Sequence, residues 1–317
     1  MHVLVIASTV LLAAAVLQAN SLTAVRDSYP DLSPDGTKLL FQSNRSGRQS
    51  LWLADPDGSG PVLLFDGSEL GMDPATPRWS PDGRLIVFAM KPAGATDENE
   101  SEIYLMQRDG SHVRRLTNAP GDDSHPHWTV DGKRIFFNSA RATPDLKADW
   151  SKQWIDIYSV DANGSDLRRH THCGSVCTYP VPSPDGRFVA YRKIVDSAGF
   201  DWSLQSAGRN SDVVVGRIGQ GASVNVSDSP AFDGWPMWSP DGRWLVFASN
   251  RDRLANVGQI YAVRPDGSGL RRVTSGSISR AQPSFSADGK HLYVYENLET
   301  SDFEIGHLAQ FKVSLPE

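Results

Sequence analysis

Short apolar runs recur along this chain, and each one follows an Asp-Gly pair. The runs occupy residues 39–41, 85–88, 135–137, 188–191, 244–247 and 292–295, and they consist of aliphatic and aromatic residues without a charge. Uninterrupted apolar runs of this length predict strands that are covered on both faces. The polar residues between the runs carry the turn signals.

An eight-residue phrase precedes each run, with the form x-Pro-x-bulky-Ser/Thr-x-Asp-Gly. Its proline and its Asp-Gly pair are present in all six copies, which begin at Tyr29, Thr76, His125, Tyr179, Trp235 and Gln282. Asp-Gly favours a tight turn, because glycine readily takes a positive φ and Asp bonds to the local backbone. Proline has no N–H to donate and therefore belongs in an edge strand or at a strand start. Each repeat is thus predicted to open with a short strand, a turn and a longer buried strand.

A second pair of strands is predicted to close each repeat. The third strands are expected at residues 51–53, 102–105, 156–160, 212–215 and 259–263, and most are followed by a Gly-Ser turn and a short outer strand with an Arg-Arg pair. The Asp-Gly turns start at residues 35, 82, 131, 185, 241 and 288, a spacing typical of propeller repeats with loop insertions. Residues 20–317 are therefore predicted to form an all-β, six-bladed β-propeller with four-stranded antiparallel blades. A β-sandwich with recurring turns is the alternative.

The repeat resembles that of the TolB family of β-propellers. The resemblance rests on the phrase itself, the Asn-Arg pairs at Asn44 and Asn250, the Ile-Tyr third strands and the Asp-Gly-Ser turns, and it extends from Leu22 to the C-terminus. It implies the fold more than the activity, because similar repeats occur in periplasmic scaffolds, in peptidase propellers and in polysaccharide lyases. TolB proteins carry an α/β domain before the propeller. Here residues 21–27 lead directly into the first repeat, so the resemblance covers the propeller part only.

The first 19 residues resemble a secretory signal peptide. An apolar run at residues 3–17 ends in Leu17-Gln18-Ala19, although no basic residue precedes it. The run is too short to cross a membrane comfortably, and a buried first strand is the alternative reading. We therefore expect a periplasmic or secreted protein without a membrane span in the mature chain.

The overall charge gives no support for nucleic-acid binding. The chain has 31 basic and 37 acidic residues, which give a net charge of -6. A nucleic-acid-binding protein usually carries a strong basic footprint. We therefore expect no nucleic acid as partner. Because the protein is expected to be exported, its expected partner is an envelope protein or a glycan.

Two segments could close the ring of blades. Residues 22–26 resemble the Leu-Thr ends of the outer strands and could complete the last blade from the N-terminus. Residues 311–315 could do so from the C-terminus, after a third strand near Glu304 and Ile305. Either solution would remove sheet edges that could otherwise pair with other chains.

The only two cysteines, Cys173 and Cys177, lie close together between the third and fourth repeats. In an exported protein such a pair is most simply a disulfide. The neighbouring His170 and His172 raise the alternative of a zinc site with two nitrogen and two sulfur ligands. The spacing matches no familiar zinc module, and two free thiols remain a third alternative.

Two insertions interrupt the regular spacing. Residues 141–153 carry Trp150 and lead to Trp154, and residues 195–211 carry Phe200 and Trp202. Loops of this length in a compact domain are often functional, and exposed aromatic side chains suit sugar rings or a protein partner. The alternative is that these aromatic residues cover blade edges.

The residues before the six prolines form the predicted ligand-binding site. The innermost strands of a propeller converge on its central channel, so equivalent positions should form a ring near one channel mouth. That ring would contain Tyr29, Thr76, His125, Tyr179, Trp235 and Gln282. Its aromatic, imidazole, amide and hydroxyl groups suit a sugar or an extended peptide. The alternative is that they pack between the blades and plug the channel.

Catalytic signatures are weak. The chain has neither a Gly-x-Ser-x-Gly nucleophile elbow nor a phosphate-binding glycine loop. The resemblance to propeller lyases would imply a metal held by several histidines, whereas the ring offers His125 with His127 nearby. Asp31, Asp122 and Asp123 could pair for glycosidase chemistry. We therefore predict no catalytic residues, no metal site and no cofactor.

The predicted function is non-catalytic binding in the cell envelope, with a protein or a glycan held at the channel mouth. The alternative is a carbohydrate-active enzyme, either a polysaccharide lyase or a glycoside hydrolase, that uses His125 and nearby carboxylates on the same face.

Overall fold

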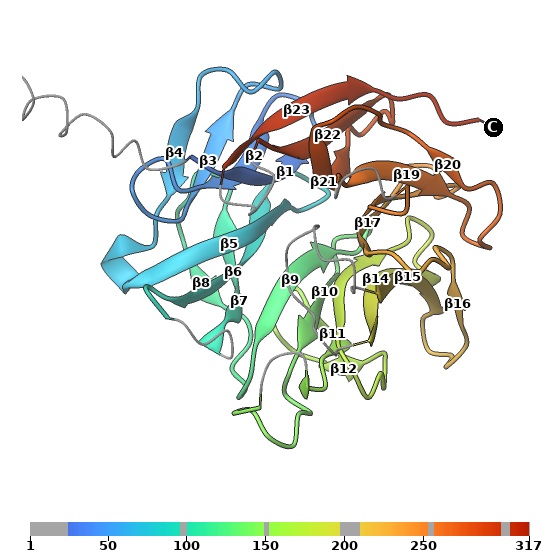
Figure 1. The fold of residues 1–317 in the computed structure, drawn as a ribbon. Coiled ribbons are helices and arrows are strands. Elements are labelled where there is room, and N and C mark those ends of the chain that lie inside the picture. Colours follow the sequence, from blue (N-terminus) through green and yellow to red (C-terminus); the bar gives the residue numbers. More distant parts are fainter. Residues whose placement is uncertain are drawn as a thin grey trace, which may run out of the picture.

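Six β-sheets surround a central axis (Figure 1). The computed structural model describes residues 25–95, 100–148, 152–196, 210–252, 257–298 and 305–316. Each sheet is one blade, and its strands follow one another in sequence from the axis outward. Neighbouring strands are antiparallel throughout. The predicted six-bladed, all-β propeller is therefore confirmed.

The first three blades each contain four strands. Blade 1 consists of β1 (Asp27–Leu32), β2 (Leu39–Ser43), β3 (Ser50–Ala54) and β4 (Val62–Phe65). After the 3-10 helix η1 (Ser68–Leu70), blade 2 consists of β5 (Met72–Trp79), β6 (Leu85–Pro92), β7 (Glu102–Gln107) and β8 (Arg114–Arg115). Blade 3 consists of β9 (Asp123–Trp128), β10 (Arg134–Ser139), β11 (Asp156–Asp161) and β12 (Arg168–Arg169).

Blades 4 and 5 repeat this plan, and blade 6 has three strands within the described residues. Blade 4 consists of β13 (Cys177–Pro182), β14 (Phe188–Asp196), β15 (Asn210–Arg217) and β16 (Ser223–Asn225). Blade 5 consists of β17 (Asp233–Trp238), β18 (Leu245–Ser249), β19 (Gln259–Val263) and β20 (Arg271–Arg272). Blade 6 consists of β21 (Ser279–Phe285), β22 (His291–Asn297) and β23 (Gly306–Lys312).

The Ser/Thr-x-Asp-Gly part of the phrase forms the turn between the first and second strands. In blade 1 the Ser33 hydroxyl donates to Asp35 Oδ1 at 2.6 Å and accepts the N–H of Lys38 at 2.9 Å. The same hydroxyl-to-aspartate bond occurs at 2.6 Å in the other five blades. Gly36 has a φ of 72°, a value that glycine adopts without steric cost. The second strands then run through the blade interiors, and all five residues of β2 are buried.

Each proline of the phrase lies in a β-bulge of its inner strand. The register between first and second strands shifts at this point in all six blades. The residue before the proline has a positive φ in every blade, between 51° and 56°. Left-handed backbone is unfavourable for residues other than glycine, and bulges commonly redirect a side chain. The repeated bulge therefore places one side chain of each blade toward the channel.

The arginine of the Asn-Arg signature forms an ion pair, and the asparagine accepts a backbone N–H just before the inner strand, from Arg26 at Asn44 and from Phe232 at Asn250. Arg251 donates to both carboxylate oxygens of Asp233 at 3.0 Å, and its guanidinium lies 5.2 Å from the centre of the Phe247 ring. Arg45 with Asp27 and Arg141 with Asp123 repeat the arrangement in blades 1 and 3. The pair joins the start of the first strand to the end of the second.

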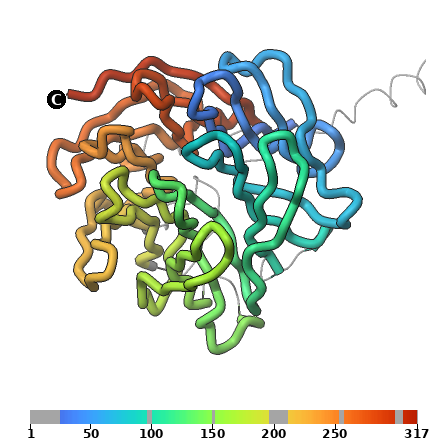
Figure 2. Tube along the Cα trace, turned by 180° about the vertical axis from the view of Figure 1, so that it is seen from behind, coloured from blue at the N-terminus to red at the C-terminus, as the bar shows by residue number. Residues whose placement is uncertain are grey.

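Blade 6 meets blade 1 to close the ring, as seen from both sides in Figures 1 and 2. Gly306 N donates to the Val25 carbonyl at 3.2 Å, and Gly306 pairs in parallel with Arg26. Of the two alternatives for ring closure, residues 311–315 do not form a separate outer strand. Residues 306–312 form the third strand, β23, which pairs with β22 and positions Phe311 opposite Leu292. The alternative segment, residues 22–26, lies mostly outside the described residues.

Other predictions fall outside the described chain as well. The predicted signal peptide at residues 1–19 is among them, and so are Trp150, Phe200 and Trp202 of the two insertions. In the part of the chain that the structure describes, no helix combines the length and apolar character of a membrane span.

Candidate functional site

A cavity of about 420 Å³ lies at one end of the central channel. This volume falls within the range of about 300–1,000 Å³ that is common for small-molecule sites. All six predicted ring residues line it, together with residues from the starts of the inner strands such as Ser28 and Ser124. The bulges described above therefore bring the six equivalent positions together around one cavity.

The aromatic members of the ring contact one another across the channel. The hydroxyl oxygens of Tyr29 and Tyr179, from blades 1 and 4, are 3.3 Å apart. The His125 ring lies 3.9 Å from the Tyr179 ring, centre to centre, and Trp235 packs edge-on against Tyr179 at 5.8 Å. Tyr179 and Trp235 retain only 9% and 8% of their exposure. These contacts form a floor beneath the cavity.

The floor also separates this cavity from a second, much smaller one of about 30 Å³. The six ring residues line both cavities, and the prolines that follow four of them line only the smaller one. The ring residues therefore line the larger cavity on one side and close the channel toward the smaller one on the other.

Side-chain amides satisfy the backbone at the strained ring positions. Gln282 Oε1 accepts the N–H of Tyr29 at 2.9 Å, and Gln42 Oε1 accepts the N–H of Thr76 at 2.7 Å. Asn138 Oδ1 lies 3.4 Å from the N–H of Tyr179. Left-handed backbone outside glycine persists only where its surroundings hold it, and these bonds supply part of that support.

His125 is held in one orientation and lacks a charge at neutral pH. Its Nδ1 lies 2.9 Å from Asn138 Oδ1, an atom that can only accept, so Nδ1 carries the proton and Nε2 is an acceptor. Burial lowers the pKa of His125 to about 3, although its hydrogen bond to Asn138 acts in the opposite direction, and the nearby Arg192 and Arg78 lower the pKa further. A neutral imidazole with this pKa is a poor general base.

Sequence reasoning missed the residues behind the ring. Asn138 Nδ2 donates to Ser124 Oγ at 2.9 Å, and Ser124 in turn donates to Asp122. Gln42 and Asn138 occupy equivalent places in their strands, opposite Ser28 and Ser124. The signal that could have identified them is a polar residue directly after the apolar run of a second strand.

The carboxylates suggested for glycosidase chemistry do not form a pair. Asp31 Oδ2 accepts the N–H of Trp79 at 2.7 Å, and burial raises its pKa despite the neighbouring Arg78. Asp123 is fully buried and bonds Arg141 at 2.6 Å, whereas Asp122 lines the cavity. Within the described ranges, no three side chains of His, Cys, Asp or Glu gather as a set that could hold a metal ion.

The lining of the cavity also carries charges of both signs. Arg26 and Lys91 line it together with Asp73 and Asp122. Asp73 forms an ion pair with Arg48 at 2.8 Å. The cavity therefore combines an aromatic and amide floor without charge and charged lining residues of both signs.

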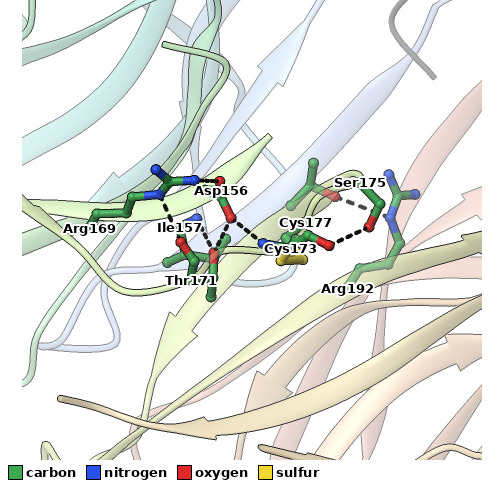
Figure 3. Close-up of a disulfide and its surroundings, with 9 residues drawn as sticks. Asp156, Ile157, Arg169, Thr171, Cys173, Ser175, Cys177 and Arg192 are labelled. Atoms are coloured by element: carbon green, nitrogen blue, oxygen red, sulfur yellow. Dashed lines mark hydrogen bonds and ion pairs between the residues drawn. A yellow bond between two sulfur atoms is a disulfide. The ribbon is translucent and has the colours of Figure 1, made fainter. Parts of the chain in front are cut away.

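Cys173 and Cys177 are joined by a disulfide at the entry to blade 4 (Figure 3). The N–H of Cys173 donates to Asp156 Oδ1 at 2.7 Å, and Thr171 donates to the same oxygen at 2.8 Å. Arg169 bonds the other carboxylate oxygen at 2.6 Å. His170 instead stacks on Phe136 and bonds Ser159, so it does not join the sulfur atoms.

Both insertions connect a second strand to a third strand. Because neighbouring strands are antiparallel, these connections leave from the face where the inner strands begin, which is the face of the cavity. Trp154, which ends the first insertion, is 44% exposed. Thr143 Oγ1 accepts its N–H and donates to its carbonyl, each at 3.0 Å.

Comparisons with known proteins agree with this architecture. The chain is 26% identical over 243 residues to an uncharacterized peptidase of Bacillus subtilis, YuxL, covering 74% of this chain and 31% of the relative. It superposes on the crystal structure of TolB from Acinetobacter baumannii with a TM-score of 0.62 and 25% identity, covering 81% of this chain and 56% of TolB. An oligogalacturonate lyase in complex with manganese shares the fold at 16% identity and a TM-score of 0.57, and the superposition covers 86% of this chain and 75% of the lyase.

The chain spans about a third of the length of the curated relatives that it matches first. Residues 51–297 match the family model described as the Tricorn protease N-terminal beta propeller domain. This match covers most of the described blades, and the TolB relationship agrees with it. The chain therefore belongs to the Tricorn protease N-terminal beta propeller family and is a TolB-like β-propeller.

Proposed function

We propose that this protein is a binding propeller of the cell envelope that holds a segment of a protein or a glycan in the cavity at the channel mouth. The observation that carries this proposal is the convergence of six bulged residues on one 420 Å³ cavity. Six strained backbone positions cost stability, and such strain is often retained where a site must be shaped.

The chemistry of the floor supports binding rather than turnover. Tyr29, Tyr179 and Trp235 offer aromatic surface with polar edges, which suits recognition of ligands that are partly apolar. His125 is neutral and already bonded to Asn138. The TolB-like repeat supports a periplasmic location, and we propose residues 1–19 as the export signal.

Affinity capture from an envelope extract tests the proposal, with the full mature propeller as bait. The test variant is Trp235→Ala, which removes the largest aromatic surface of the floor. The control is Val62→Ala, because Val62 is an exposed apolar residue of the outer strand β4 that does not line the cavity. We expect the specific partner to be retained by the wild type and by Val62→Ala and to be lost by Trp235→Ala.

A thermal melt of each variant separates loss of binding from loss of folding. Tyr179→Phe provides a milder variant if Trp235→Ala unfolds, because it keeps the ring and removes only the hydroxyl. Capture that is unchanged in both folded cavity variants would contradict the proposed site.

A carbohydrate-active enzyme is the second candidate, since Asp122 and His125 both line the cavity. The measurement is product release from neutral and acidic polysaccharides, with and without added divalent metal ions. Turnover that disappears in His125→Asn would support this function over a binding module.

A further inference from the structure

Two groups of side chains in the cavity lining differ in chemistry. His125, Tyr179 and Trp235, from blades 3 to 5, are part of the floor and supply aromatic surface. Ser28, Gln49 and Thr76, from blades 1 and 2, supply hydroxyl and amide groups. We call the first group the aromatic wall and the second group the polar wall. A ligand that fills the cavity meets both of them.

The polar wall contains hydrogen-bonding atoms that lack a protein partner. Among the described residues, Ser28 Oγ, Gln49 Nε2 and Thr76 Oγ1 are buried without a hydrogen bond. Ser28 and Thr76 are 2% and 7% exposed. Buried polar groups are nearly always paired in folded proteins, so three orphans on one wall of one cavity require an explanation. A ligand with hydroxyl groups would supply the missing partners.

Thr76 is unusual in a second respect. It is a β-branched residue with a φ of 51°, a conformation that is especially unfavourable for such side chains. Its backbone N–H is satisfied by Gln42, but its hydroxyl is not satisfied. The backbone at this position is therefore held in place, while the buried side-chain oxygen has no hydrogen-bond partner among the described residues.

Two backbone N–H groups of the floor already have hydrogen-bond acceptors and cannot bind a peptide main chain. The N–H groups of Tyr29 and Thr76 already donate to Gln282 and Gln42. Peptides that bind in extended form usually rely on main-chain hydrogen bonds to an accessible strand edge. Recognition here must use side-chain hydroxyl, amide and aromatic groups instead.

The electrostatics favour a ligand without net charge. The floor has no charged member at neutral pH, since the pKa of His125 is low. The cavity lining contains Arg26 and Lys91 as well as Asp73 and Asp122, and Asp73 is already paired with Arg48. An acidic ligand would therefore meet no uniformly basic surface.

We infer that the ligand is a neutral glycan, with one sugar ring stacked on the aromatic wall and its hydroxyls bonded to Ser28, Gln49 and Thr76. This inference rests on the proposed function and names its ligand class. The C–H face of a sugar ring packs on an aromatic ring, while its hydroxyls both donate and accept. The Ser28 and Thr76 oxygens are buried in the free protein. In this proposal each side chain rotates about χ1 to another staggered rotamer, and this rotation brings its hydroxyl to the ligand.

The decisive variant is Thr76→Val, which replaces the orphan hydroxyl by a methyl group of the same shape. We expect neutral-sugar binding to weaken about tenfold and the melting temperature of the free protein to stay unchanged or rise, because an unpaired buried hydroxyl is removed. The matched control is Thr117→Val. Thr117 is buried too, but its hydroxyl bonds Glu102 at 2.6 Å and Ile103 N at 3.0 Å. That control should lower the melting temperature and leave the affinity unchanged.

The experiment titrates the mature protein with neutral trisaccharides of gluco, galacto, manno and N-acetylgluco type, and with trigalacturonic acid, by calorimetry. Binding of a neutral trisaccharide that Thr76→Val weakens supports the inference. No binding of any neutral sugar, tighter binding of trigalacturonic acid, or an affinity that Thr76→Val leaves unchanged would overturn it. If the envelope capture still depends on Trp235 in that case, the proposed binding function stands with another ligand class.

Discussion

The hydroxyl oxygens of Tyr29 and Tyr179 meet 3.3 Å apart across the axis of the propeller. The two residues stand at equivalent positions of blades 1 and 4, which face each other in a ring of six. Their contact closes the channel below the cavity, so the site has a floor and is not an open tunnel. The closure also joins opposite sides of the ring through side chains alone.

Removal of the two hydroxyls should reveal this coupling. We predict that Tyr29→Phe and Tyr179→Phe each lower the free energy of unfolding, and that their effects are not additive. A double-mutant cycle by urea denaturation should give a coupling energy of about 0.5–1.5 kcal/mol, the usual net value of a hydrogen bond. Additive effects would show that the two hydroxyls do not bond in solution.

The buried ion pair between Asp233 and Arg251 should be costly to break. Asp233 is fully buried, and Arg251 is 12% exposed, so Asp233→Ala leaves a nearly buried cation without its partner. We predict a loss of about 3–5 kcal/mol in the free energy of unfolding, measured by urea denaturation.

A surface pair provides the control for this prediction. Lys38 and Asp55 form an ion pair at a similar distance of 2.8 Å, but both side chains are largely exposed. Asp55→Ala should therefore cost at most about 1 kcal/mol. Equal losses of unfolding free energy in Asp233→Ala and Asp55→Ala would mean that burial does not decide how much these ion pairs contribute to stability.

The repeat made most of the fold predictable. Its six prolines and Asp-Gly pairs mark the bulge and the turn of each blade, and both features depend on local backbone chemistry. The blade 6 closure was harder to predict. Residues after 304 continue the third strand because Phe311 packs opposite Leu292, and this contact depends on tertiary packing.

The site was predictable in position but not in detail. The repeat alone identifies the six ring positions, since equivalent residues of equivalent strands must surround the axis. The orphan hydroxyls of Ser28 and Thr76 could not be predicted, because they depend on how neighbouring blades pack. The same applies to Asn138, whose amide reaches residues from two blades.

His125 should make the protein less stable in mild acid. Its pKa is lowered to about 3, mainly by burial, from an unfolded value near 6.5. Stability is therefore fully present above pH 6.5 and is lost as the pH falls toward 3, because the unfolded chain binds the proton first. His127 and His170, whose pKa values burial lowers to about 4, contribute in the same direction. We predict that His125→Asn flattens the decline of the melting temperature between pH 7 and pH 4, and an unchanged slope would contradict this assignment.

The disulfide should stabilise blade 4 against unfolding. Cys173 and Cys177 close a loop with a sequence separation of 4, and the loss of chain entropy in the unfolded state for so short a loop corresponds to about 2 kcal/mol. We predict that the Cys173→Ser/Cys177→Ser variant loses about this much free energy of unfolding, measured by urea denaturation without reductant. Reductant should lower the wild type to the same level and leave the variant unaffected, which serves as the internal control. Equal midpoints for the oxidised wild type and the variant would show that the hydrogen bonds of Asp156 to Thr171 and Cys173 hold this segment without the covalent link.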